Sequence, residues 1–135
     1  MKSDLKIIND FTDLTVWQLA HQLKIEVYSF TELLPDSEKY NRVTQLKKAV
    51  SSISANIAEG FGRYHFQENI QFCRQARGSL DETKDHLITS RDLHEAPIER
   101  CNGLIEKCNL LKKVLNGYIR SLKNTKYHQL ITNNQ

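Results

Sequence analysis

The amino-acid sequence predicts an all-α protein, an antiparallel up-down-up-down four-helix bundle. Three observations lead to this prediction. Apolar residues recur at alternating steps of three and four positions, which is the period of an amphipathic α-helix. Of the 135 residues only 2 are proline and 5 are glycine, so few positions interrupt a helix. The segments between the apolar series are short, and short connections place consecutive helices side by side in opposite directions.

The first two helices are expected between residues 16 and 61. The first apolar series is Val16, Ala20, Leu23, Val27, Phe30 and Leu34. Pro35 follows this series, and because the residue before a proline avoids the helical conformation, the helix should end there. The second series is Val43, Leu46, Val50, Ile53, Ile57 and Phe61. Gly60 and Gly62 lie at its end, where glycine readily takes the left-handed conformation of a helix C-terminus.

The last two helices are expected between residues 66 and 122. The third series is Phe66, Ile70, Cys73, Ala76, Leu80 and Leu87, and the fourth is Ile98, Cys101, Ile105, Cys108, Leu111, Leu115, Tyr118 and Leu122. Pro97 suits the first turn of the last helix, where its missing N–H costs nothing. The period is lost after Lys123. We therefore expect an N-terminal extension (1–12), a bundle domain (13–123) and a polar C-terminal tail (124–135) that frays.

The charged residues alternate in sign along the chain. The overall net charge is only +3, but residues 1–38 carry −4, residues 39–77 carry +5, residues 78–106 carry −4 and residues 107–135 carry +6. Basic blocks nearly free of acids favour a partner with a phosphate backbone, because neutralised phosphates release their counterions. They suit an acidic surface of a neighbouring subunit equally well, so complementarity between subunits is a serious alternative.

The candidate phosphate-binding residues come from both basic blocks. They are Arg42, Lys47, Lys48, Arg63, Arg74, Arg77, Lys112 and Lys113. Few aromatic residues lie among them, Tyr64 and Phe72 being the exceptions, so base stacking is not an obvious contributor. Phosphate contacts carry no direct base information, and we therefore expect weak sequence specificity.

A second group of candidates forms polar or small-residue motifs. These residues are Asn56, Glu59, Gly60, Gly78 and Ser79. Asn56, Glu59 and Arg63 share one face of the second helix. They form either a cluster that binds a ligand or an internal network that fixes the next turn, and we favour the network because buried polar groups are usually satisfied locally. Gly78 and Ser79 predict a close helix–helix approach, with a hydrated pocket as the alternative, because glycine inside a helix needs compensation.

No catalytic or metal-binding pattern stands out. The five histidines form no HExxH motif, and no acid is followed three residues later by the histidine that a di-iron bundle needs. Cys73, Cys101 and Cys108 contain no CxxC pair and are expected to be buried and reduced. No apolar run approaches the ~18 residues of a membrane span, and no secretory signal is visible. We expect a cytoplasmic, non-enzymatic protein without cofactor, metal or membrane contact.

Three segments of the chain resemble one known family. They are residues 45–63 (QLKKAVSSISANIAEGFGR), residues 77–82 (RGSLDE) and residues 13–21 (DLTVWQLAH). The family comprises bacterial four-helix bundle proteins associated with intervening sequences in 23S ribosomal RNA genes, often labelled ribosomal proteins, and the likeness covers about residues 11–122. Ser54 stands where the family usually has proline, so we expect a weaker kink in the second helix.

The resemblance implies a four-helix protomer that assembles as a ring-shaped homopentamer. Accessory proteins of diversity-generating retroelements share this architecture and bind nucleic acid and a reverse transcriptase. RNA, DNA and a protein partner are therefore the expected partners besides further copies of the chain. The leading hypothesis is a homo-oligomeric protein that binds nucleic acid, RNA before DNA, through basic helix faces. The alternative is a structural or adaptor oligomer whose basic blocks pair with acidic faces of subunits or of a protein partner.

Overall fold

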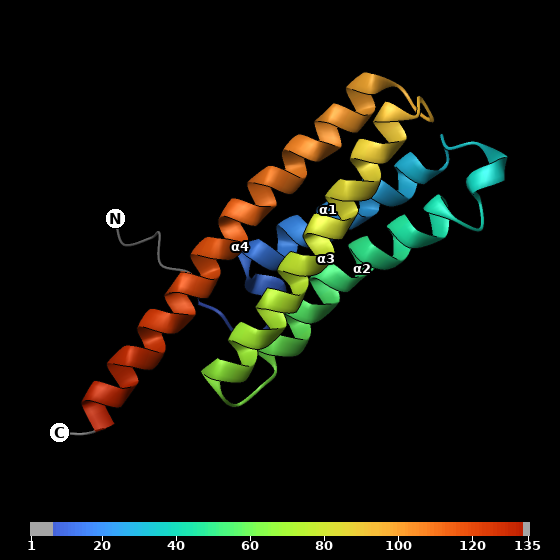
Figure 1. Ribbon diagram of the computed structural model, residues 1–135. Helices are drawn as coiled ribbons and strands as arrows, with labels where there is room; N and C mark the ends of the chain where they lie inside the picture. Colours follow the sequence, from blue (N-terminus) through green and yellow to red (C-terminus); the bar gives the residue numbers. More distant parts are fainter. Residues whose placement is uncertain (1–6, 134–135) are drawn as a thin grey trace.

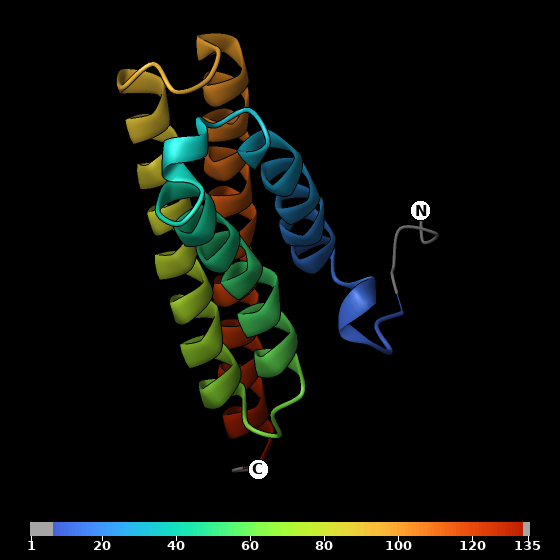
Figure 2. The same cartoon turned by 90° about the vertical axis from the view of Figure 1, so that its right-hand side faces the viewer.

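The computed structural model describes residues 7–133, and side chains for residues 7–125. Over this range the chain forms four α-helices and two short 3-10 turns, with no strand. The helices are α1 (Thr15–Thr31), α2 (Arg42–Phe61), α3 (Phe66–Asp92) and α4 (Ile98–Asn133), and the turns are η2 (Phe11–Asp13) and η3 (Asp36–Glu38). The predicted all-α fold class is thus confirmed. Figure 1 shows the bundle, and in Figure 2 the N-terminal end of α1 leans away from the other helices.

Neighbouring helices run in opposite directions, as the order of their contacts shows. Arg77 on α3 contacts Asn116 on α4, whereas Asp81, one turn further along α3, contacts Lys112, one turn earlier on α4. The hydrogen bonds that join α1 to α2 follow the same rule. α2 is one continuous helix through Ser54, which is buried and accepts a hydrogen bond from the Lys24 ammonium group on α1 at 3.2 Å.

The apolar series form the core where the helices face one another. Phe30, Leu46, Leu80 and Leu115 are fully buried, one from each helix. Ile98 is an exception, since it stands at the first position of α4 and is 49% exposed. None of the helices among the described residues combines the length and the apolar character that crossing a membrane requires.

The three cysteines are free and buried, as the sequence predicts. Burial raises the pKa of the Cys73 and Cys108 thiols to about 12, and it also raises the pKa of Cys101. These groups therefore remain protonated near neutral pH and behave as small apolar side chains of the core.

Two helix ends differ from the expectation. α4 continues beyond Lys123 to Asn133, so residues 124–133, which the sequence predicts as a tail after the bundle domain, belong to the last helix. No proline or glycine interrupts residues 124–133, and hydrogen bonding along the helix continues without a breaker. α2 ends at Phe61 with Gly62 as its C-cap, but Gly62 has a right-handed φ of −77°. Residues 1–6 of the predicted extension and 134–135 of the predicted tail lie outside the described residues.

Candidate nucleic-acid interface

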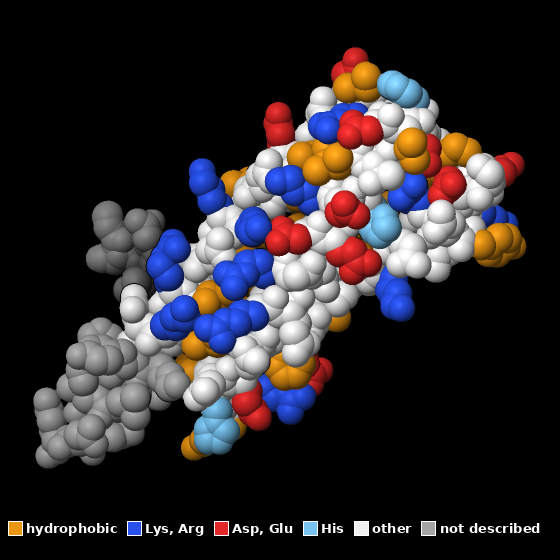
Figure 3. Space-filling view, in the orientation of Figure 1, with side chains coloured by type: hydrophobic (Ala, Val, Ile, Leu, Met, Phe, Trp, Pro, Cys, Tyr) orange, Lys and Arg blue, Asp and Glu red, His pale blue; other side chains and the backbone are white. Residues whose placement is uncertain are grey.

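Basic side chains gather along the surface that α3 and α4 share. We call this surface the basic face, and it comprises Arg74, Arg77, Lys112, Lys113, Arg120 and Lys123. Arg74 and Arg77 are three positions apart on α3. On α4, Lys113 and Arg120 are seven positions apart, which is two helical turns, and Lys112 and Lys123 lie next to them, so the residues of each helix lie on one side of it. Figure 3 shows Lys and Arg side chains gathered over the middle of α4 and the adjoining part of α3.

Contacts between the helices join the two rows into one surface. The Arg77 Nη1 donates to the Asn116 Oδ1 at 2.7 Å, and the Lys112 Nζ lies 3.0 Å from the Asp81 Oδ1. Arg74 donates to the neutral side chain of Gln71 at 3.0 Å. Two of these three contacts are with amides, which satisfy hydrogen bonds without cancelling charge.

The basic face has little negative charge near it. Residues 69–80 of α3 and 107–123 of α4 contain no Asp or Glu. The acids that border these stretches are Glu68, Asp81 and Glu106. Asp81 pairs with Lys112, and their side chains are 52% and 41% exposed. An ion pair this open to water is weak and can exchange partners. Lys113 and Lys123 are exposed and have no acidic partner among the described residues. The surface therefore presents uncompensated positive charge.

Arg42 does not belong to this surface. Its Nε lies 2.8 Å from the Glu95 Oε1 and its Nη2 lies 3.4 Å from the Oε2, while its Nη1 lies 3.4 Å from the His86 Nδ1. The Arg42 side chain is 12% exposed and the Glu95 side chain 9%. The guanidinium therefore ties the start of α2 to the turn between α3 and α4. The expectation that Arg42 contacts phosphate is wrong, because its charge is enclosed and already paired.

The other predicted basic residues lie on separate surfaces. The Lys47 ammonium stands 5.1 Å from the centre of the Tyr28 ring, between α1 and α2. Lys48 is exposed on α2. Arg63 follows α2 and is paired with Glu59 at 2.7 Å. The structure therefore brings together four of the eight predicted residues, all from α3 and α4. Arg120 and Lys123 were missed as site residues, although their three-residue spacing on a basic helix was visible.

A hydrogen-bond network links α2 to α3. The Asn56 Nδ2 donates to the Ser52 carbonyl oxygen at 2.8 Å and to its Oγ at 2.9 Å, and the Ser79 Oγ donates to the same Ser52 Oγ at 2.9 Å. The favoured interpretation, an internal network of Asn56, Glu59 and Arg63, is met only in part. Glu59 pairs with Arg63, whereas Asn56 bonds to Ser52 and not to either of them. Ser52 is the residue that sequence reasoning missed, and its i−4 spacing from Asn56 was the available signal.

The two motif glycines do not have the roles expected of them. Gly60 is buried inside α2, and a Cβ there would lie 2.6 Å from the Asn69 Oδ1 and 2.9 Å from the Phe72 Cβ. This is where α2 and α3 approach closely. Gly78 was expected to allow such an approach, and that prediction is wrong. It is exposed, and a Cβ there would meet no atom within 4 Å.

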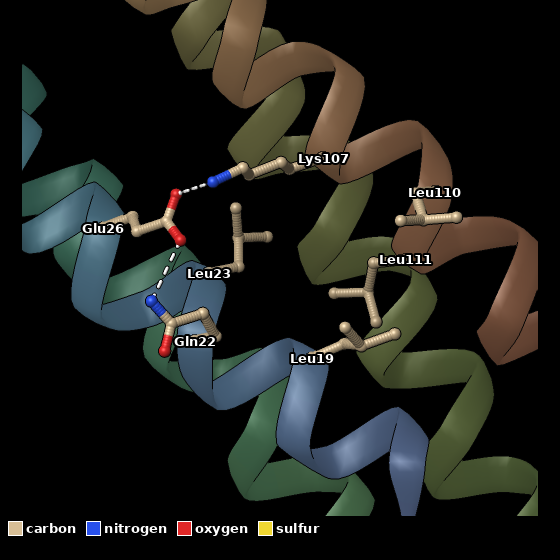
Figure 4. Close-up of a pocket in the computed structure, with 7 residues that line it drawn as sticks. All are labelled: Leu19, Gln22, Leu23, Glu26, Lys107, Leu110 and Leu111. Carbon is tan, nitrogen blue, oxygen red and sulfur yellow. Dashed lines mark hydrogen bonds and ion pairs between the residues drawn. The ribbon is translucent and has the colours of Figure 1, made fainter.

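A groove lies between α1 and α4, where the inclination of α1 opens the bundle. Its volume is about 240 Å³, and Figure 4 shows its lining residues, Leu19, Gln22, Leu23, Glu26, Lys107, Leu110 and Leu111. Lys107 pairs with Glu26 across one end, and Gln22 donates to the same carboxylate at 3.0 Å. Burial alone would raise the pKa of Glu26, but the hydrogen bonds from Lys107 and Gln22 hold it below its ordinary value. Leu110 is 54% exposed, so part of the apolar lining of the groove is open to solvent.

Residues 12–117 match the sequence profile of the 23S rRNA-intervening sequence protein family. The chain belongs to this family. A protein of unknown function from the S23 ribosomal protein family of Bacteroides thetaiotaomicron has a similar crystal structure, with a TM-score of 0.73 and 18% sequence identity. The similarity covers 78% of this chain and 98% of that one, and at this identity it shows the fold alone. No curated protein matches the sequence.

The family match covers only part of the basic face. It includes Arg74, Arg77, Lys112 and Lys113 but ends before Arg120 and Lys123. This member of the 23S rRNA-intervening sequence family thus continues its basic surface beyond the matched segment, along α4. No group of His, Cys, Asp or Glu among its described residues is arranged to hold a metal ion.

Proposed function

We propose that this protein binds RNA through the basic face, as a non-enzymatic protein that contacts phosphates. The supporting observation is the row of six basic side chains on adjoining sides of α3 and α4, over two stretches that contain no acid. The family description, which refers to 23S rRNA, favours RNA over DNA. Arg and Lys contacts with phosphates position a nucleic acid without reading its sequence.

The size of the basic face suits several phosphates. The stretch of α4 from Lys112 to Lys123 is about 17 Å long at about 1.5 Å per residue. A duplex carries one charge per about 1.7 Å of axis, so about ten phosphate charges lie within that length. Each neutralised phosphate contributes about −0.9 to the slope of log K against log salt concentration. Five or six contacts therefore predict a slope of about −5 for the wild-type protein.

Fluorescence anisotropy with a labelled RNA hairpin, at a series of salt concentrations, tests this function. A double variant, Lys113→Glu with Lys123→Glu, removes two exposed cations from the basic face. Two lost contacts predict about 30-fold weaker binding near 0.15 M salt and a slope that is smaller by about two. Lys48→Glu is the matched control, because Lys48 is also an exposed lysine but lies on α2. An equal loss of RNA affinity in the double variant and in Lys48→Glu would refute the proposal. So would a wild type that does not bind the RNA.

We also propose that the protomer forms a homo-oligomer, and that the groove between α1 and α4 belongs to the contact. The groove is apolar and partly open at Leu110, and the outer surface of α1 exposes Ile25 by 52% and Tyr28 by 40%. Two different apolar surfaces on one protomer suit a head-to-tail contact, and such contacts form a ring when the rotation between neighbouring subunits closes. The pentamer that the family resemblance implies is one such ring.

Light scattering of the purified protein tests the assembly. A pentamer has five times the protomer mass of 15.7 kDa. Leu110→Lys should dissociate it, whereas Leu93→Lys should not, because Leu93 is 59% exposed in the turn between α3 and α4, away from the groove. A monomeric wild type would contradict the proposal.

In the adaptor alternative the basic face pairs with acidic surface, so high salt would separate the subunits and RNA would not bind.

A further inference from the structure

The turn between α2 and α3 exposes an aromatic ring to solvent. Tyr64 is 92% exposed, more than any other large apolar side chain among the described residues. Its ring meets the His65 ring edge to face, with 5.0 Å between the centroids and 82° between the planes. This contact favours one orientation of the tyrosine ring, and the ring remains exposed to solvent. A planar, open aromatic ring is the surface on which unpaired bases stack.

The basic face ends beside this turn. Asn69 near the start of α3 donates to the Tyr118 hydroxyl on α4 at 3.4 Å, which sets the register of the two helices. Because the helices run in opposite directions, Lys123, five residues further along α4, lies toward the end of the bundle that holds this turn. Arg74 lies about 14 Å from the turn, at about 1.5 Å per residue along α3. Figure 2 shows the turn and the C-terminal part of α4 at the same end of the bundle.

The segment that carries Tyr64 is anchored on both sides. Arg63, the preceding residue, pairs with Glu59 and lies 4.9 Å above the Phe72 ring. The backbone N–H of Asn69 donates to the backbone carbonyl oxygen of His65 at 3.1 Å, at the start of α3. An anchored segment loses less conformational entropy when it binds a ligand than a free loop does.

We propose that Tyr64 is a base-stacking platform, and that the preferred ligand is an RNA duplex with an unpaired nucleotide at its end. The inference rests on the proposed function, since the duplex phosphates would lie on the basic face. Among the side chains described, up to residue 125, that face offers no open ring of its own: Tyr118 is partly buried and bonded to Asn69, and Phe72 is covered by Arg63. The base next to the duplex end stacks on Tyr64. Sequence preference is small, because every base has a flat face.

Two RNAs that share one duplex test the proposal, one blunt and one with a short single-stranded extension. The wild type should bind the extended RNA at least about fivefold more tightly, which is the low end for stacking of one base. Tyr64→Ala should abolish this preference without changing blunt-duplex affinity, and Tyr64→Phe should retain it. Tyr40→Ala is the matched control, because Tyr40 is 86% exposed and lies in the loop between α1 and α2, where Lys39 stands 5.6 Å from its ring.

The outcomes separate this inference from the proposed function. If the wild type binds neither RNA at physiological salt, the proposed function fails. If it binds both RNAs equally, or if Tyr64→Ala retains the preference, the stacking role is refuted while binding through the basic face stands. A 2-aminopurine in the extension gives a second readout: its fluorescence should be quenched by the wild type and by Tyr64→Phe. Unchanged fluorescence with the wild type would overturn the proposal.

Discussion

Replacing Glu95 with glutamine should destabilise the bundle strongly, although Glu95 lies in a turn. Its carboxylate holds the Arg42 guanidinium through two contacts, at 2.8 and 3.4 Å. Only 9% of the Glu95 side chain and 12% of the Arg42 side chain are exposed. Glu95→Gln keeps the shape of the side chain but removes its charge. The guanidinium then remains charged in an enclosed position with no acidic partner.

The geometry sets the magnitude of this loss. Removing one partner of a fully buried ion pair costs about 3–5 kcal/mol. Here water reaches about a tenth of each side chain, and the new amide oxygen still accepts a hydrogen bond, so we expect about 2–3 kcal/mol. With an unfolding entropy of about 2.1 cal/mol/K per residue, the midpoint of thermal unfolding falls by about 9 °C. Arg42→Met combined with Glu95→Leu removes both charges and should recover most of this loss.

Thermal and urea unfolding followed by circular dichroism measures the effect. Glu59→Gln is the matched control, because the Glu59–Arg63 pair has a comparable distance of 2.7 Å but side chains that are 54% and 42% exposed. An exposed pair of this kind contributes about 0.5 kcal/mol, so the midpoint should fall by less than about 2 °C. Equal shifts in the two variants, or a double variant as unstable as Glu95→Gln, would show that burial of the pair does not decide its contribution.

Three further predictions concern packing, backbone strain and the buried thiols. Gly60→Ala should destabilise by about 1–3 kcal/mol by overpacking, whereas Gly78→Ala should stabilise by about 0.5–1 kcal/mol, and urea unfolding checks the opposite signs. His94 has a left-handed φ of 58° in the turn after α3, so His94→Gly should raise the thermal midpoint by a few degrees, and a lower midpoint would contradict the strain. Burial raises the pKa of Cys73 and Cys108 from 9.0 to about 12, so their contribution to stability is complete below pH 9 and is lost as pH rises toward 12. Serine in place of both thiols should flatten this alkaline decline in the free energy of unfolding.

The apolar period was sufficient to predict the helices and their inward faces. Each series has a spacing of three and four, and this spacing places Phe30, Leu46, Leu80 and Leu115 on one side of their helices before any tertiary contact is known. The period does not set helix ends equally well. Beyond Lys123 the apolar pattern stops, yet α4 continues to Asn133, because backbone hydrogen bonding needs only the absence of a breaker.

Charge along the chain indicated the basic blocks but could not distinguish their members. Arg42 and Arg77 are the same residue type in the same block, and the sequence offers no reason to separate them. Folding places Glu95, more than fifty residues away in the chain, against Arg42, and places the neutral Asn116 against Arg77. The charge of the Arg42 guanidinium is thereby enclosed and paired with a carboxylate, whereas that of Arg77 has only a neutral partner.

The local sequence pattern therefore determined the helices and the basic blocks of this protein. Tertiary contacts decided which of the basic residues are exposed without an acidic partner. The sequence by itself specified four amphipathic helices, buried thiols and two basic blocks, because each depends on residue type and spacing along a single segment. The close approach at Gly60, the pairing of Arg42 and the joining of the basic rows on α3 and α4 depend on which helices become neighbours. These contacts depend on how segments that are distant in the chain pack together. The partner that packing places against a charged side chain decides whether its charge is paired inside the protein or exposed to a ligand.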